Sequence, residues 1–478
     1  MLLSLENSFD FFSVKNSMIY NVFFRLWYQL LLLLSIAHPD RTLECFVVPC
    51  RFHCLRIARY LHNFLVCSDN RTDTLWLKKK IICHFLAGEG RTMLRKAVGK
   101  GSGVFMFSRA LSSSTSAFSR GTPHAQPMEN LVDQTRMPRE DIDWDCISFD
   151  DRHLGRYLYK STYVLGKTES WKGQLEEFGP LLLQPTAQVL NYGQSIFEGL
   201  KAYRSANGGI NLFRPGENAA RMSRGARRMM MPEVPEDVFL RAVRETAKAN
   251  ADLVPPTGKG ALYLRPLLLG TGGVLGVRPS TEYTFLVYCG AVGPYFKGGK
   301  LTPIHLKVSE DAFRAARGGT GSTKCAGNYA PCMLHTAAAR EEGYSDVVYL
   351  DAANGTFLEE VSASNVFAVK DGTVWTPPLT GTILQGVTRG SVVQIARDLG
   401  YKVREETLSI DLALECDEIF TTGTAVVIAP VGSLSYQGER HIINSGRAGP
   451  VTAQLYRSLF DLQHGAAEDT HGWLVPVC

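Results

Sequence analysis

The order of apolar runs after residue 140 constrains the fold more than any other feature of this sequence. Ala261–Gly270 and Glu282–Cys289 are apolar runs bounded by Gly and Pro, so they predict buried strands. After residue 304 the pattern changes to strand, helix and strand. This order predicts a two-domain α/β (α+β) fold. We expect a small N-terminal domain over 138–293, an interdomain loop over 294–303 and a large C-terminal domain over 304–478.

Individual elements follow from local patterns. Strands are predicted at Arg156–Leu165, Ile304–Val308 and Asp346–Leu350. The Asp-Gly pair at 371–372 predicts a hairpin between Asn365–Lys370 and Thr373–Thr376. Helices are predicted at Glu217–Met231, Asn328–Glu342 and Val387–Leu399, the last two being followed by Gly.

The segment before the first domain has a different composition. Residues 1–92 show no helical or strand period and stay unassigned. From Met93 to Pro127 there is no Asp or Glu, while five basic residues and a serine run are present. This composition over 93–137 predicts an organelle transit peptide, mitochondrial by preference and plastid as the alternative. A disordered basic tail is the competing interpretation.

Overall composition excludes several classes of protein. The net charge of +5 over 478 residues does not indicate a nucleic-acid partner. The apolar run Leu30–Ala37 is shorter than the ~20 residues that cross a bilayer, so no membrane span is expected. The 11 cysteines have no metal-ligand spacing, and no HExxH pattern occurs, so a metal site has no support.

One lysine stands in a glycine-rich stretch, "GGTGSTKCAGNYAP" at 318–331. A lysine that forms a Schiff base must lose its proton and approach a flat cofactor closely. Glycines allow that approach of the backbone. Lys324 is therefore a candidate, although this stretch taken alone favours a solvated lysine in a flexible loop, since most lysines are exposed.

A pair of acids follows in "TFLEEVSASNVFAV" at 356–369. A carboxylate in an apolar site could bind the protonated ring nitrogen of a cofactor and keep the ring an electron sink. Adjacent residues on a strand face opposite sides, so only one acid can do this. The sequence favours Glu360, and Glu359 is expected to be solvated.

Other stretches provide possible phosphate ligands. "GTILQGVTRG" at 381–390 leads into a predicted helix, and a helix start offers free amides to a phosphate dianion. "TTGTAVV" at 421–427 offers amides and hydroxyls. An arginine-rich helix follows "LNYGQSIFEGLKAYR" at 190–204. Each signal alone also fits an ordinary loop or a solvated helix.

Taken together and in this order, these stretches resemble the class IV aminotransferases, which are fold-type IV pyridoxal-phosphate enzymes. The similarity is greatest to plant-type branched-chain-amino-acid aminotransferases and covers about seven-tenths of the chain, residues 140–476. The resemblance implies transfer of the amino group of leucine, isoleucine or valine to 2-oxoglutarate. It also implies a homodimer and pyridoxal 5'-phosphate as the cofactor.

The resemblance assigns roles to individual residues. Lys324 matches the Schiff-base lysine and Glu360 the acid at the pyridine nitrogen. The remaining cofactor-binding positions match Arg221, Tyr329, Val387, Thr388 and Thr424. The substrate-pocket positions match Tyr192, Phe197, Tyr263, Arg265, Tyr295 and Ala425.

Two alternatives stay open at this point. The same fold could carry another class IV activity, that of a D-amino-acid aminotransferase or an aminodeoxychorismate lyase. The chain could also be a catalytically silent binding protein, although such a protein has no need to retain Lys324, Tyr329, Glu360 and Arg221 together.

Overall fold

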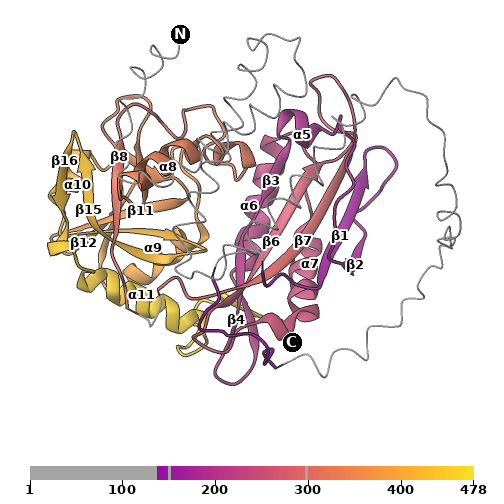
Figure 1. The fold of residues 1–478 in the computed structure, drawn as a ribbon, viewed down its shortest axis with the longest axis horizontal. Helices are drawn as coiled ribbons and strands as arrows, with labels where there is room; N and C mark the ends of the chain where they lie inside the picture. Colours follow the sequence, from indigo (N-terminus) through magenta and orange to yellow (C-terminus); the bar gives the residue numbers. More distant parts are fainter. Residues whose placement is uncertain (1–136, 149–151, 297–299, 478) are drawn as a thin grey trace, which may run out of the picture. The chain divides into compact units, whose positions relative to one another are not determined.

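The computed structural model describes residues 137–148, 152–296 and 300–477 (Figure 1). All of them belong to one compact unit. The residues predicted as unassigned sequence and transit peptide, up to 136, lie outside the described part of the chain. Within that part, no helix has the length and apolar character needed to cross a membrane.

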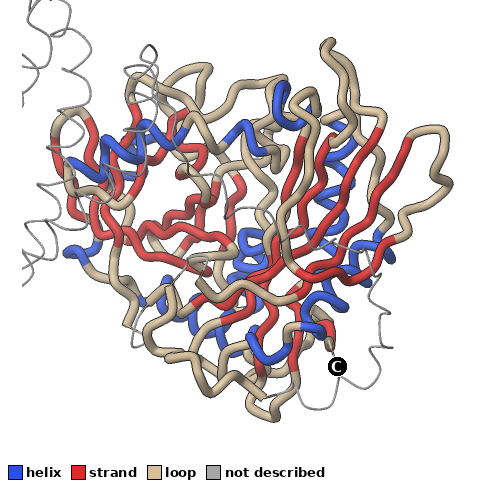
Figure 2. The backbone as a smooth tube through the Cα atoms, turned by 45° about the vertical axis from the view of Figure 1, so that its right-hand side comes forward, coloured by secondary structure: helices blue, strands red, loops and turns tan. Residues whose placement is uncertain are grey.

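The strands gather into two sheets, which Figure 2 shows as two groups of red segments. The first sheet has the order β17-β5-β4-β6-β7-β1-β2, with β3 paired to β6, and its neighbouring strands are antiparallel. Its strands are β1 Tyr157–Val164, β2 Gly173–Glu177, β3 Ser195–Phe197, β4 Leu200–Arg204, β5 Ile210–Phe213, β6 Ala261–Gly270, β7 Glu282–Val292 and β17 Leu474–Pro476.

The second sheet is mixed. It has the order β10-β9-β8-β15-β14-β11-β12-β13, with β16 paired to β15. β8 runs parallel to β9 and β15, whereas β11 is antiparallel to β14. Its strands are β8 Ile304–Ser309, β9 Asp346–Leu350, β10 Leu358–Val361, β11 Ser364–Lys370, β12 Thr373–Thr376, β13 Lys402–Glu405, β14 Glu418–Gly423, β15 Val427–Tyr436 and β16 Glu439–Ile442.

Helices pack on both sheets and close the cores. α7 contacts β1, β6 and β7 of the first sheet, and α9 and α11 contact β14 or β15 of the second. One hydrophobic cluster contains Phe213 and Val292 of the first sheet, Phe367 of the second sheet and Leu459 of α11. The two sheets therefore share a hydrophobic core. The helices are α5 Gln188–Tyr192, α6 Pro215–Arg228, α7 Glu236–Ala249, α8 Cys332–Glu341, α9 Val387–Asp398, α10 Ile410–Leu414 and α11 Pro450–Gln463.

Most predicted elements are present with small shifts. The hairpin of β11 and β12 forms as expected from Asp371 and Gly372, both of which have positive φ. The helix predicted from Asn328 begins only at Cys332, because Ala326–Asn328 forms a short 3-10 turn and Pro331 occupies the N-cap position. Proline disfavours helical geometry at the residue before it, which accounts for the later start.

Candidate active site

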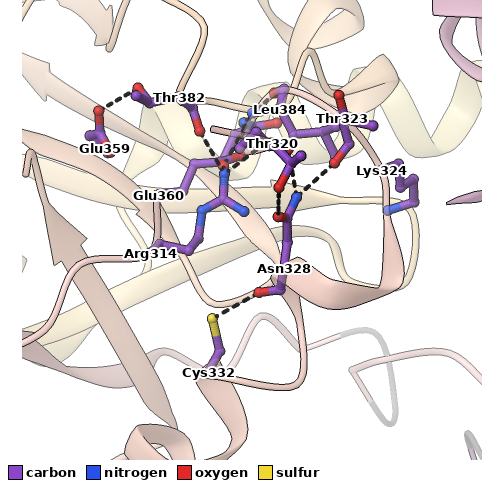
Figure 3. A network of polar contacts seen from close by, with 12 residues as sticks. Arg314, Thr320, Thr323, Lys324, Asn328, Cys332, Glu359, Glu360, Thr382 and Leu384 are labelled. Carbon is purple, nitrogen blue, oxygen red and sulfur yellow. Dashed lines mark hydrogen bonds and ion pairs between the residues drawn. The ribbon is translucent and has the colours of Figure 1, made fainter. Parts of the chain in front are cut away.

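The loop that carries Lys324 is held by one asparagine. The Asn328 side-chain amide donates to the carbonyls of Thr320 and Thr323, each at 2.7 Å (Figure 3). Its carbonyl oxygen accepts from the Thr320 hydroxyl at 2.7 Å. Gly321 lies so close to the carbonyl of Thr382 that a Cβ there would collide with it. The glycine therefore lets this loop pack against the segment after β12.

Lys324 lies in an aromatic and electropositive environment. Its Nζ donates to Tyr329 Oη at 3.0 Å and lies 4.7 Å from the centre of the Phe197 ring. Burial and, after it, the positive charge of Arg221 lower the pKa of Lys324 to about 7. A substantial fraction of this lysine is therefore a neutral amine near neutral pH, the form that attacks a carbonyl carbon.

Glu360 is buried on β10 and has three partners. Asn365 Nδ2 donates to its Oε1 at 2.7 Å, and the Leu384 amide donates to its Oε2 at 3.1 Å. Arg314 forms an ion pair with Oε2. Burial raises the pKa of Glu360 to about 7, while Arg314 and the Leu384 amide act against that rise. These donors stabilise the charged form of the buried carboxylate.

The expectation that Glu359 is solvated was wrong. Its side chain is turned away from Glu360 and accepts from the Thr382 hydroxyl at 2.5 Å (Figure 3). Only 7% of the residue is exposed. Burial raises the pKa of Glu359 as well. The sequence correctly separated the two acids by strand alternation, but it gave no sign that the segment Thr382–Leu384 covers both of them.

Arg221 is buried on α6 and is oriented by an acid from the turn after β3. Its Nε and Nη2 donate to the two carboxylate oxygens of Glu198, both at 2.7 Å, and its Nη1 donates to the carbonyl of Gln385 at 3.0 Å. Burial alone lowers the pKa of Arg221, but the Glu198 carboxylate raises it overall. Of the five guanidinium N–H groups, these bonds use three, so two remain for another anion.

The start of α9 faces the same cavity. Gly386, Val387 and Thr388 line it together with Arg221 and Thr424. The Thr424 hydroxyl donates to the carbonyl of Gly199 at 3.2 Å, which links this turn to the first sheet. A helix start with unpaired amides beside an arginine is suited to a phosphate dianion.

The predicted substrate residues fall into two groups. Phe197 contacts Tyr329 with ring centres 4.9 Å apart, and the Arg265 guanidinium lies 4.9 Å from the centre of the Phe197 ring. Arg265 Nη2 also donates to Tyr263 Oη at 3.3 Å. These three residues are therefore close to Lys324, and Ala425 directly follows the cavity-lining Thr424.

Tyr192 and Tyr295 are not brought to the cavity within this chain. Tyr192 is 45% exposed and donates to the carbonyl of Leu275 at 2.8 Å. Tyr295 is 54% exposed, and its ring packs on Phe296. Neither residue is among those that line the cavity around Lys324.

Three charged residues of the site were missed by sequence reasoning. Glu198 holds Arg221, Arg314 pairs with Glu360, and the buried Lys201 donates from Nζ to the carbonyl of Ala425 at 2.9 Å. Glu198 and Lys201 lie inside the quoted stretch "SIFEGLKAY", and Arg314 lies ten residues before Lys324. For Glu198 and Lys201, the available signal was a charge inside an otherwise apolar stretch, whereas Arg314 lies among other charged residues and gave no such signal.

The family of the chain follows from a comparison with protein-family models. Residues 195–434, half of the chain, match the model described as amino-transferase class IV. The chain belongs to the class IV aminotransferases. The predicted family and the predicted fold class are thereby confirmed.

Curated relatives of this class IV aminotransferase are plant enzymes. Branched-chain amino acid aminotransferase 2, chloroplastic, of Humulus lupulus is 50% identical over 337 residues, which are 70% of this chain and 82% of the relative. The mitochondrial aminotransferase 1 of the same plant is 46% identical over 336 residues, 70% of this chain and 84% of the relative. A methionine aminotransferase of Arabidopsis thaliana is 39% identical, over 74% and 98% of the two chains.

Solved structures of bacterial and archaeal aminotransferases share the fold. The branched-chain amino acid aminotransferase of Escherichia coli matches with a TM-score of 0.59 and 29% identity, over 68% of this chain and all of that one. The aminotransferase of Thermoproteus uzoniensis with norvaline matches with a TM-score of 0.56 and 26% identity, over 66% and 99%.

The residues of this cavity fit pyridoxal 5'-phosphate. A lysine with a lowered pKa, a buried carboxylate and an anion-binding helix start suit the aldehyde, ring nitrogen and phosphate of that cofactor. Among the described residues, no group of three or more His, Cys, Asp and Glu side chains could hold a metal ion.

Proposed function

We propose that this chain is a pyridoxal-phosphate-dependent transaminase that acts on branched-chain amino acids. It transfers the amino group of leucine, isoleucine or valine to 2-oxoglutarate and gives the 2-oxo acid and glutamate, reversibly. The observation that carries the proposal is a single cavity lined by Lys324, Tyr329, Glu360 and the start of α9. The family and the 50% identity to a plant branched-chain enzyme support it.

The residues that we assign to the cofactor each have a task in that reaction. The bound cofactor supplies an aldehyde carbon that accepts the amino group and a ring that withdraws electrons. Lys324 holds the cofactor covalently, and its Nζ then removes the proton from the substrate Cα. Tyr329 orients Nζ through their 3.0 Å hydrogen bond. With the cofactor bound, Glu360 would accept a hydrogen bond from the ring nitrogen, and Arg221 with Val387, Thr388 and Thr424 would hold the phosphate.

The pocket residues suit two kinds of side chain. The rings of Phe197 and Tyr263 offer apolar surface to an aliphatic side chain, while the Arg265 guanidinium beside them can pair with the second carboxylate of glutamate. Apolar side chains that differ by one methyl group are separated by only ~1–3 kcal/mol in such a pocket. We therefore expect activity with all three branched-chain amino acids.

A panel of half-reactions tests the substrate class. The cofactor absorption of the holoenzyme is followed after addition of leucine, isoleucine, valine, glutamate, methionine or D-alanine. We expect rapid spectral conversion with the three branched-chain amino acids and with glutamate. Conversion by D-alanine alone would identify the enzyme as a D-amino-acid aminotransferase, and no conversion by any of them would contradict transamination.

Replacement of the lysine tests the chemistry. Lys324→Ala removes the amine that holds the cofactor and moves the Cα proton, so turnover of leucine should fall below detection while the fold persists. Steady-state assays and far-ultraviolet circular dichroism measure the two properties. Full turnover by the alanine variant without an added amine would refute the assignment of Lys324.

We further propose that the enzyme is a homodimer. Leu190 and Tyr192 of α5 and the neighbouring Leu275 and Val277 are exposed apolar side chains. Hydrogen bonds from Tyr192 to Leu275 and from Gln188 to Val274 hold these two segments together as one surface. A second copy would bury that surface. Sedimentation velocity of the purified enzyme should give the mass of two chains.

Two sequence predictions stay proposals. Relatives carry both chloroplastic and mitochondrial names, which supports an organelle location for this chain. We propose that residues 93–137 direct it to the mitochondrion, and a fluorescent fusion of this segment should co-localise with a mitochondrial marker rather than with plastids. We also propose the predicted division of the chain into a domain over 138–293, a loop over 294–303 and a domain over 304–478.

A further inference from the structure

A second cavity, of about 470 Å³, lies beside β10 but is lined by Glu359 rather than by Glu360. Its walls are mainly apolar and include Phe357, Leu358, Pro377, Pro378 and Ile383. Small-molecule sites typically have ~300–1,000 Å³ and apolar walls with few polar groups. This cavity therefore has the size and lining of a ligand site, and it has no part in the reaction described above.

Three charged residues line this cavity, the acids Glu359 and Asp351 and the cation Arg317, and the Asp351 carboxylate already accepts from the backbone amides of Asn354, Thr356 and Phe357. Glu359 is 7% exposed, and while one of its oxygens accepts from Thr382, its Oε2 has no hydrogen-bond partner among the described residues. A buried acceptor without a partner is unfavourable, so a donor brought to it is stabilising. Arg317, an exposed residue of the lining, supplies a cation to the same cavity.

We infer that this cavity binds a small α-amino acid with an aliphatic side chain. The ammonium group would pair with Glu359, the carboxylate with Arg317, and the side chain would pack on Phe357 and the two prolines. An inorganic cation would satisfy Glu359 but leave the apolar wall and the arginine unused. A fatty acid would satisfy the wall but bring a second carboxylate towards Glu359.

The cavity is connected to the active site through Thr382. The hydroxyl of Thr382 donates to Glu359, and its carbonyl accepts from Arg314 Nη2 at 2.9 Å (Figure 3). Arg314 is the residue that pairs with Glu360 and also donates to the carbonyl of Gly321 in the Lys324 loop at 3.1 Å. Occupancy of the cavity would therefore alter turnover through Arg314. This effect rests on the proposed function, whereas the ligand site stands on the residues of the cavity.

Titration calorimetry of the holoenzyme with 2-methylleucine tests the inference. This probe has an ammonium group, a carboxylate and an isobutyl side chain, but it has no Cα hydrogen and cannot be transaminated. We expect two binding sites per chain in the wild type, the active site and the cavity. Glu359→Gln and the cavity-filling Ala353→Trp should each weaken one site at least tenfold. Glu439→Gln, an exposed acid on β16, serves as the control and should keep both.

The outcomes separate the two proposals. One site per chain in the wild type, or an unchanged titration in Glu359→Gln, would overturn the inference even if leucine is turned over normally. Loss of one site in Glu359→Gln with no turnover of any amino acid would support the cavity and refute the proposed reaction. If Ala353→Trp does not fold, which thermal unfolding detects, Glu359→Gln alone decides.

Discussion

Lys324 shows how burial turns a common side chain into a reactive one. Burial together with the nearby Arg221 brings the pKa of Lys324 to about 7, compared with 10.5 for an exposed lysine. Because the neutral amine is the nucleophile, lowering the pKa increases the reactive fraction at neutral pH. The neutral fraction of Lys324 increases with pH, since a lysine loses its charge as the pH rises through its pKa.

The first prediction concerns this titration. The rate at which pyridoxal phosphate attaches covalently to the apoenzyme should rise between pH 6 and pH 8 and level off above about pH 8. Stopped-flow absorbance of the cofactor at a series of pH values measures it. A rate that continues to rise towards pH 10, as for an ordinary lysine, would contradict the lowered pKa.

The two adjacent acids on β10 provide a matched pair for a second prediction. Glu360→Gln should slow turnover of leucine far more than Glu359→Gln, because only Glu360 faces the cavity of Lys324. Glutamine keeps the shape but loses the charge that stabilises the protonated ring. Loss of a charge-assisted bond of ~1.5–3 kcal/mol corresponds to roughly a ten- to hundredfold lower rate. Single-turnover rates measure it.

The comparison is decisive because both acids are buried. Equal defects would show that the charge at β10 matters only for folding, and a larger defect in Glu359→Gln would show that the carboxylates were assigned in the wrong order. Thermal unfolding of both variants separates a loss of stability from a loss of catalysis.

At this scale, the sequence allowed predictions only where a residue belongs to a local pattern. The order of the motifs predicts the role of Lys324, and strand alternation predicts that Glu360 and Glu359 face opposite sides; both roles stay predictions. Arg314 could not be found, because the contact of that arginine with Glu360 spans 46 positions in the chain and depends on how the loop after β8 meets β10. The same holds for the pair of Glu198 and Arg221, which only the packing of α6 against the turn after β3 creates.

Among the elements, α6 and α9 together line one side of the cavity, where we propose that the phosphate binds, and Arg214 joins them. Arg214 caps α6 with a left-handed backbone, and its Nη1 donates to Ser391 of α9 at 2.9 Å. Its guanidinium also lies 4.5 Å from the centre of the Trp473 ring, just before β17. Trp473 in the C-terminal segment thus supports Arg214, the residue that fixes α6 against α9.

The third prediction follows from this contact. Arg214→Ala should weaken retention of pyridoxal phosphate about three- to tenfold, because losing a hydrogen bond of ~0.5–1.5 kcal/mol loosens α6 against α9. Arg227→Ala on the same helix removes only an exposed ion pair with Glu233 and serves as the control. Equilibrium dialysis of the cofactor measures both. Equal affinities in the two variants would show that Arg214 has no role in the phosphate site.

The elements themselves were largely predictable from the sequence. β6 and β9 have the predicted limits, because apolar runs between Gly, Pro and charged residues leave little choice of boundary. The start of α8 and the pairing of β17 with β5 were not foreseen. The first depends on a 3-10 turn around Asn328, and the second joins segments more than 250 positions apart, which no local pattern encodes.

At the scale of the whole molecule, the two sheets depend on one another. Each sheet has a hydrophobic core of its own, and a third hydrophobic cluster and the return of β17 to the first sheet join the two halves. The fold also begins early in the described part of the chain. Ile142 and Ile147 are buried in the first core, and the Arg139 amide donates to the carbonyl of Asp252 at 3.0 Å.

The last prediction follows from where these contacts begin. A chain that starts at residue 138 retains Arg139, Ile142 and Ile147, and with them every core contact named above, so it should fold, form the proposed dimer and transaminate leucine with wild-type kcat. A chain that starts at residue 150 lacks the two isoleucines. Burying such a side chain contributes ~1.5–3 kcal/mol, and the shorter chain should therefore unfold at a lower temperature. Calorimetry, sedimentation and steady-state kinetics on both chains decide the point. An inactive chain from residue 138, beside an active full-length chain, would place part of the functional fold before that residue.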